Sequence, residues 1–72
     1  MVDWTIRGVV SSFPAGKITV TVVMLVGGEY ALAVDRKVIQ GVYWLNEERL
    51  ACEFAAKRMA ERIAKEEAKV GS

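Results

Sequence analysis

The feature that most constrains this chain is a nearly uncharged, β-branched run over residues 18–34, which Gly27-Gly28 interrupts. A membrane-spanning helix needs about 20 consecutive apolar residues, and this run is shorter and broken. Two strands joined by a turn account for it better, because Val, Ile and Thr favour strands and paired glycines favour turns. The run therefore predicts a β-hairpin with strands over residues 17–26 and 29–35. The first of these strands would aggregate at a sheet edge, so we expect it in the centre of a sheet.

Residues 2–13 precede this hairpin, and their apolar and polar side chains alternate. A period of two is typical of a strand that is buried on one face. Residues 14–16, with the sequence Pro-Ala-Gly, suit a three-residue hairpin loop closed by a glycine bulge. That loop pairs Val10 with Val20 and places Trp4 on the same apolar face, towards the core.

The register of the second hairpin has two alternatives. A two-residue loop at Gly27-Gly28 pairs Val20 with Asp35, which puts a carboxylate on the core face. A loop one residue longer pairs Met24 with Leu32 and keeps that face apolar. Because a shift by one residue moves every side chain to the other face, burial favours a loop of odd length or a bulge after residue 26.

The last third of the chain predicts one helix over residues 46–69. Asn46 is a favourable N-cap, and Glu47 and Glu48 put negative charge in the first turn, where the helix macrodipole stabilises it. Good helix formers follow. The face that we expect to pack on a sheet carries Ala51, Cys52, Ala55, Ala56, Met59 and Ile63.

Together these elements predict one α+β domain over residues 1–72. An antiparallel meander sheet spans residues 2–44, and the helix over residues 46–69 packs on one face of it. Residues 38–44 form either a short fourth strand or an extended connection, and Gly41 in their middle disfavours the strand. The predicted sheet therefore has three or four strands.

The composition predicts that part of the apolar surface is buried against another protein. The chain has 72 residues, of which 53% are hydrophobic, whereas roughly 45–50% is usual in soluble domains. A domain of this size buries only about 60% of the surface that its unfolded chain exposes. One helix and a small sheet cannot hide such a surplus, so we expect a homodimer or a complex with another protein.

Six apolar residues are candidates for that interface. Those on the outer sheet face do not face the helix, and those on the helix point away from the sheet. An aromatic residue just before the helix is a third kind of candidate, because Trp dominates binding hot spots. The candidates are Val9, Val23, Leu25, Trp44, Leu50 and Phe54.

The residues needed for most catalysis and metal binding are missing from the sequence. There is no histidine and only one cysteine, Cys52, so a histidine general base and a thiolate zinc site are both excluded. Cys52 falls among alanines on the apolar face of the helix, where it is expected to be a small buried hydrophobe. We therefore expect no catalytic residue, no metal and no cofactor, and hence a protein that is not an enzyme.

Nucleic-acid binding is the alternative function. The order strand-strand-strand-helix resembles, in topology, the sheet-based DNA-binding modules of plant AP2-type regulators and of integrase arm-binding domains. That resemblance implies a sheet face that contacts DNA or RNA through Arg7, Lys17, Arg36 and Lys37. A net charge of +1 supplies little of the attraction that such binding requires.

The remaining expectations concern where the chain works and what it does there. Its first residues lack the basic and apolar regions of a secretory signal, and a lone cysteine suits a reducing compartment, so we expect a cytoplasmic, intracellular protein. In size and in its lack of motifs the chain resembles phage-encoded inhibitors of host defence, including anti-CRISPR proteins. That resemblance implies a viral protein that inhibits a partner by occluding its surface.

Overall fold

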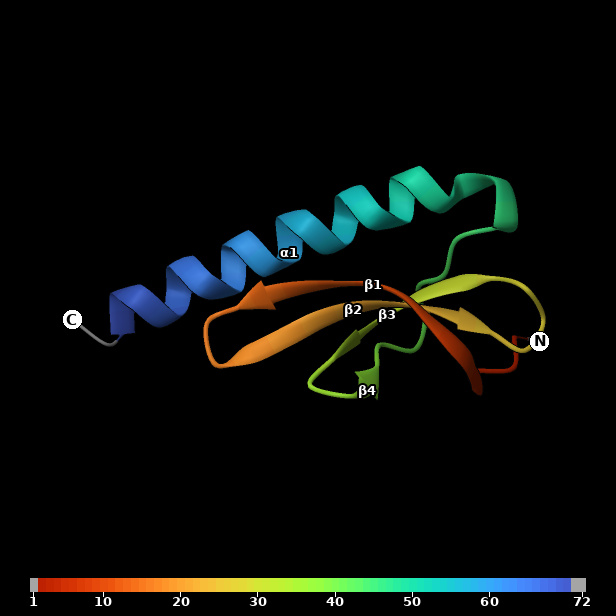
Figure 1. Cartoon of the computed structure of the whole chain (residues 1–72), viewed down its shortest axis with the longest axis horizontal. Helices are drawn as coiled ribbons and strands as arrows, with labels where there is room; N and C mark the ends of the chain where they lie inside the picture. The colour runs from red at the N-terminus through yellow and green to blue at the C-terminus, as the bar shows by residue number, and fades with distance from the viewer. Residues whose placement is uncertain (1, 71–72) are drawn as a thin grey trace.

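The computed structural model describes residues 2–70, and it contains a four-stranded antiparallel sheet followed by one long helix. The strands are β1 (Ile6–Ala15), β2 (Ile18–Leu25), β3 (Tyr30–Val34) and β4 (Lys37–Val38), and they lie side by side in chain order. A 3₁₀ turn, η1 (Asn46–Glu48), leads into α1 (Arg49–Val70), which lies along one side of the sheet (Figure 1). The predicted α+β meander with a C-terminal helix is confirmed.

The helix covers one face of the sheet through small side chains. Cys52, Ala56 and Ala60 recur every four residues and are buried, so one line of the helix lies close to the strands. Their buried partners in the sheet are Ala15, Val20, Val22, Tyr30 and Leu32. We call this cluster the helix-side core.

The opposite face of the sheet has a core of its own, made of Val23, Leu25, Ala31 and Ala33. It packs against Val2, Trp4 and Val38, from the N-terminal residues and β4, which lie on the side of the sheet away from α1 (Figure 1). The ring of Tyr43 stands edge-on to that of Trp4, with 6.2 Å between their centroids. We call this cluster the second core.

The second core corrects the expectation for Val23 and Leu25. Both were expected on an exposed sheet face, but their exposed fractions are 1% and 0%. As the composition predicted, α1 alone does not cover Val23 and Leu25. The chain covers them itself, with its N-terminal residues and β4, so their predicted exposure is wrong.

The first hairpin turns at Gly16-Lys17 rather than at residues 14–16. Ala15 pairs with Ile18 and Phe13 with Val20, so the predicted pairing of Val10 with Val20 is wrong. Gly16 has a φ of 69°, and a positive φ at the first of two loop residues is the geometry of a type II′ turn.

A contact far along the chain accompanies this turn. The backbone N–H of Lys17 donates to both carboxylate oxygens of Glu67, each at 3.2 Å, near the end of α1. Local turn chemistry cannot anticipate such a contact. Two irregularities in β1, between Ile6 and Gly8 and between Val9 and Ser11, then change its register on β2. The irregularity between Ile6 and Gly8 changes the face of the residues before it, since Gly8 pairs with Met24 and Ile6 with Leu25. Trp4 therefore packs on the second core rather than facing the helix.

The second hairpin confirms the predicted odd-length loop. The N–H of Leu25 donates to the carbonyl of Glu29 at 2.8 Å, which closes a three-residue loop over residues 26–28. Gly28 has a φ of 95°, as expected for the glycine bulge that ends such a loop. The strand partner of Met24 is Tyr30 rather than Leu32. A shift of two residues leaves each side chain on its predicted face.

Residues 38–44 combine the two predicted alternatives. Only Val38 belongs to a strand, and the chain then continues as an irregular connection. It returns to β3 at Trp44, whose N–H and carbonyl both bond to the backbone of Tyr30 at 2.8 Å. Trp44 and Tyr43 therefore point to different faces, one towards the helix-side core and the other towards Trp4 of the second core.

The helix begins where predicted, but a different residue caps it. The N–H of Leu45 donates to the side chain of Glu48 at 2.9 Å, which is one half of a capping box. Asn46, the predicted N-cap, instead accepts a hydrogen bond from the hydroxyl of Tyr30 at 3.3 Å. The predicted cap is therefore wrong by one residue, because a tertiary partner occupies the asparagine.

Candidate protein-interaction surface

The structure places the six predicted interface residues in three environments. Leu50, Phe54 and Val9 are exposed, with 81%, 61% and 67% of their surface accessible. Trp44 is partly buried against the helix-side core. The remaining two, Val23 and Leu25, lie inside the second core. The structure does not bring all six together on one surface.

Leu50 and Phe54 form an apolar patch on the outer side of α1, opposite the line of Cys52, Ala56 and Ala60 that packs on the sheet. They are four residues apart and therefore adjacent on the helix surface. The guanidinium carbon of Arg58, one turn further on, lies 5.7 Å from the centroid of the Phe54 ring, within the range of a cation–π contact.

The patch belongs to a longer row of side chains that alternate in spacing by three and four residues. We call this row the outer stripe. Its members are Glu47, in the turn η1, and Leu50, Phe54, Lys57 and Glu61, in α1. Its spacing is the heptad spacing that brings side chains of one helix against another helix. All five members are exposed. The outer stripe is therefore an exposed surface with an apolar centre and charged ends.

Val9 belongs to a second exposed apolar group, on the edge strand β1. Val9 and Ile6 pair with Val23 and Leu25, and so border the second core. An open edge strand can add another strand. The two irregularities of β1 and Pro14 within it are features that protect sheet edges from such pairing. This group is therefore a weaker candidate interface than the outer stripe.

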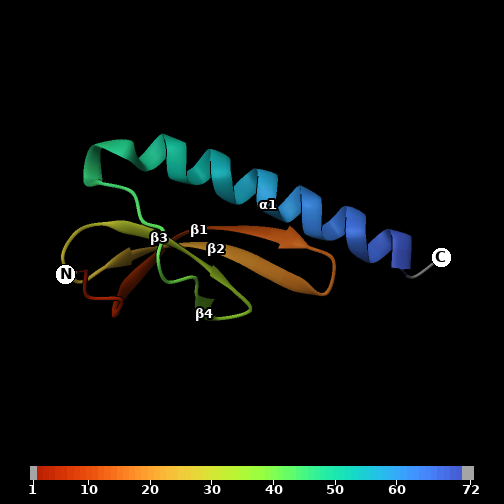
Figure 2. The same ribbon diagram turned by 180° about the vertical axis from the view of Figure 1, so that it is seen from behind.

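The four cations of the nucleic-acid alternative are exposed but not gathered. Arg7 lies near the start of β1 and Lys17 in the turn after its end. Ten residues of extended chain separate them, which is roughly 30 Å. Arg36 lies in the turn between β3 and β4, and Lys37 is the first residue of β4; Figure 2 shows this turn beside the label of β4. A contact to one short stretch of nucleic acid would not use all four.

Cys52, the cysteine that a nucleophile or a thiolate ligand would require, lies inside the helix-side core. Cys52 is fully buried, and burial, with a smaller contribution from the charge of Glu53, raises the pKa of its thiol to about 11. The reactive thiolate is therefore disfavoured at neutral pH. Over residues 2–70 no three Cys, Asp or Glu side chains converge into a group that could hold a metal ion.

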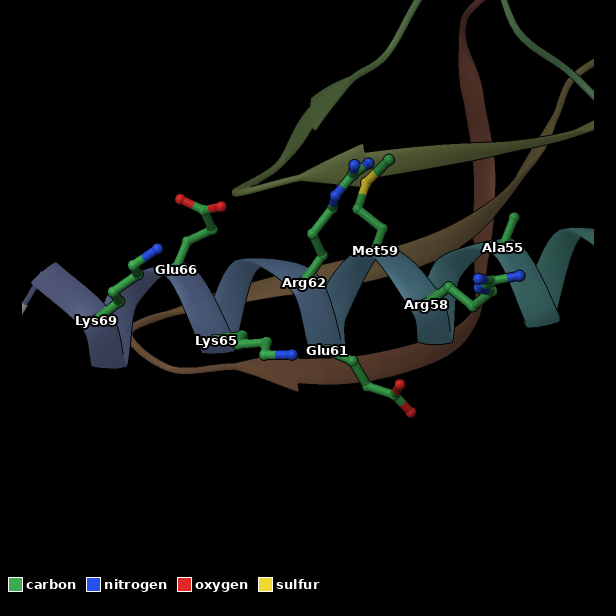
Figure 3. Close-up of a pocket in the computed structure, with 8 residues that line it drawn as sticks. All are labelled: Ala55, Arg58, Met59, Glu61, Arg62, Lys65, Glu66 and Lys69. Atoms are coloured by element: carbon green, nitrogen blue, oxygen red, sulfur yellow. The ribbon is translucent and has the colours of Figure 1, made fainter.

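A second surface of α1 was not anticipated from the sequence. Side chains of α1 alone border an open surface groove of about 930 Å³, and four of them are basic, at spacings of four, three and four residues (Figure 3). The basic residues are Arg58, Arg62, Lys65 and Lys69, and Glu61 and Glu66 lie beside them. The signal for this row in the sequence is the helical spacing of its basic residues, rather than the periodicity of apolar ones.

A small apolar cavity adjoins the groove. Its volume is about 130 Å³, and it lies between α1, β3 and the connection that follows β4. Six apolar residues line it: Leu32, Ile39, Val42, Trp44, Ala55 and Met59. Ala55 and Met59 also line the groove, so the two spaces share a wall. Trp44, which was predicted to anchor an interface, therefore lines this cavity and is partly buried rather than exposed.

Comparisons of the chain with known protein families, with curated proteins and with solved structures found no match. Within the described residues, α1 is too polar to cross a bilayer and no other helix is long enough.

Proposed function

We propose that this chain is a non-enzymatic protein-interaction module that self-associates through the outer stripe of α1. The observation that carries the proposal is the high exposure of Leu50 and Phe54, at 81% and 61%, side by side on a regular helix. Removing one large apolar side chain from water contributes about 1.5–3 kcal/mol. A second copy of the chain can supply that burial.

The charges of the outer stripe favour a second copy in antiparallel orientation. When Leu50 of one helix lies opposite Phe54 of the other, Glu47 of each helix lies opposite Lys57 of its partner. The pairing occurs twice because the arrangement has two-fold symmetry. A parallel arrangement in register would instead place Lys57 against Lys57. Opposite charges at the flanks of a helix pair are known to set orientation in this way.

The proposed dimer is weak, because its apolar centre is small. Stable interfaces bury about 1,200–2,000 Å² in total, and smaller ones belong to transient complexes. The outer stripe offers two large apolar side chains per copy, at its centre. We therefore expect a dissociation constant in the micromolar range or weaker, with monomer and dimer both populated.

A more specific role, inhibition of a partner protein, is also proposed. A small intracellular viral inhibitor of the anti-CRISPR type would act by covering a partner surface, and the exposed Leu50 and Phe54 would then contact that partner. Self-association and partner binding through the same stripe would compete with each other. An added partner would then lower the fraction of dimer.

The experiment that tests self-association is light scattering after size exclusion, from about 10 µM to 1 mM, a range that brackets weak dimers. The wild-type mass should rise from the 7.9 kDa of the monomer towards twice that value. The double substitution Leu50→Gln and Phe54→Gln should hold the mass at the monomer value and leave the circular dichroism unchanged, because both side chains are exposed.

The matched control replaces an exposed apolar residue outside the stripe, Val9→Thr. This variant should dimerise like the wild type. A wild-type chain that stays monomeric at 1 mM, or a Val9→Thr variant that loses the dimer as fully as the double variant, contradicts the proposal.

A further inference from the structure

We infer that the groove of α1 and its adjoining cavity form a binding site for an acidic peptide segment of a partner protein, with one bulky apolar side chain of that segment in the cavity. The inference rests on the proposed role as an interaction module, but not on self-association. It concerns a neighbouring part of α1, defined by Ala55, Met59, Arg62 and Lys65, which borders the outer stripe at Glu61.

The cavity determines the apolar part of the ligand. Its volume of about 130 Å³ is close to that of apolar cavities that take up one benzene-sized molecule. All its lining side chains are apolar, so a polar group inside it would lose its hydrogen bonds. A leucine, methionine or phenylalanine side chain meets both conditions. A nucleobase does not, because its polar edges would be left without partners, and a long acyl chain exceeds the volume.

The groove determines the charged part of the ligand. Arg58 follows Ala55 by three residues and Arg62 follows Met59 by three, so each cation is a surface neighbour of a residue that lines the cavity. Even without Lys69, three cations in the groove outnumber its two carboxylates, so the groove keeps a positive excess. A ligand residue next to the buried apolar side chain therefore meets positive charge, which selects Asp or Glu there.

The spacing along α1 gives the length of the segment. Eleven residues separate Arg58 from Lys69, which is about 16 Å of helix. An extended peptide covers that distance in about five residues. The site thus fits a short segment in which one apolar residue is followed or preceded by several acidic ones. Glu61 and Glu66 would repel segments in which the carboxylates fall opposite them.

The test uses twelve-residue fluorescein-labelled peptides of Glu, Gly and Ser with one central Leu, Met or Phe. Each is titrated into protein whose methionine methyl groups carry ¹³C. The signal of Met59, in the cavity wall, should shift in a saturable way, whereas that of Met24, in the helix-side core, should stay in place. A peptide with central Ser should bind at least about tenfold more weakly, since it forfeits the burial of one apolar side chain.

Two sets of variants separate the cavity from the charges. Ala55→Leu fills the cavity and should abolish the Met59 shift. Arg62→Glu with Lys65→Glu should weaken binding about tenfold, because two attractions become repulsions. The matched control, Arg7→Glu with Lys37→Glu, changes the net charge equally outside the groove and should alter the affinity less than twofold.

Three results overturn the inference. The first is the absence of a Met59 shift with any of the three acidic peptides at 2 mM. The second is an equal loss of affinity in the control pair Arg7→Glu and Lys37→Glu. The third is a twelve-nucleotide single-stranded DNA that binds more tightly than the peptides, with an affinity unaffected by Ala55→Leu. That last result assigns the groove to nucleic acid.

The same titration on the Leu50→Gln and Phe54→Gln variant distinguishes this inference from the proposed dimer. Peptide binding that persists in the monomeric double variant supports the groove alone. A wild-type chain that dimerises without any Met59 shift keeps the self-association and removes the peptide site.

Discussion

The two cores on either side of the sheet are closed in different ways. The helix-side core has a continuous cover, because α1 packs on β1, β2 and β3 through a line of small residues. The second core is closed by short pieces, the N-terminal residues with Trp4 and the two-residue strand β4. The difference shows that a central strand such as β2 can be buried on both faces although the chain has only one helix.

The two modes of closure predict different sensitivities. A helix held by alanines and a cysteine leaves little room between itself and the strands, so added volume should be costly there. The second core holds a large aliphatic side chain, Leu25, so lost volume should be costly there. The comparison is therefore tested by one substitution that removes volume from the second core and one that adds volume to the helix-side core.

The largest expected effect is that of Leu25→Ala. Leu25 is 0% exposed in the second core, and removing a buried leucine costs about 2–5 kcal/mol. Urea denaturation should show a loss near 3 kcal/mol. Val26→Ala, at the neighbouring exposed position, is the control and should cost far less. A loss under about 1 kcal/mol at Leu25 would mean that the N-terminal residues do not form a packed cover and that Leu25 is free to serve an interface, as the sequence first indicated.

The second effect is that of Ala56→Leu in the helix-side core. Ala56 is 0% exposed between α1 and the sheet, and overpacking a tight core costs about 1–3 kcal/mol. The same change at the exposed Ala68 should cost almost nothing, since both residues are good helix formers. Thermal unfolding of the two variants gives the comparison. Equal melting temperatures would show that the helix can move away from the sheet and that its alanines do not enforce close packing.

The two cores also mark what the sequence could and could not predict. Alternation assigned the β2 side chains to two faces correctly, and burial chose the odd-length loop over residues 26–28, since a wrong choice would have placed Asp35 on the core face. Neither alternation nor burial distinguishes two registers that differ by two residues, because each side chain keeps its face in both. Met24 lies opposite Tyr30 because the three-residue loop covers residues 26–28, one residue earlier than the loop of the same length that pairs Met24 with Leu32.

The failures have a common cause in contacts between distant parts of the chain. The turn at Gly16-Lys17 is bound by Glu67, fifty residues away, and Asn46 is bound by Tyr30 rather than by the helix end. The exposure of Leu50 and Phe54 was predictable from the helical wheel. The groove was not predicted, and its adjoining cavity exists only once α1, β3 and the connection are assembled.

The smallest expected effect is a gain in stability from Arg36→Gly, in the turn that attaches β4 to the second core. Asp35 and Arg36 have φ values of 52° and 70°, the geometry of a type I′ turn. A left-handed conformation costs a non-glycine residue roughly 1–2 kcal/mol, whereas glycine adopts it freely but loses more entropy on folding. The net gain should be about 0.5 kcal/mol, measured by urea denaturation. Lys37→Gly, one residue later in β4, should destabilise instead, since glycine weakens a strand. If Arg36→Gly also destabilises the protein, the side chain of Arg36 stabilises β4 by more than its left-handed backbone costs. The second core would then depend on a contact made by this turn, for which the helix-side core has no counterpart.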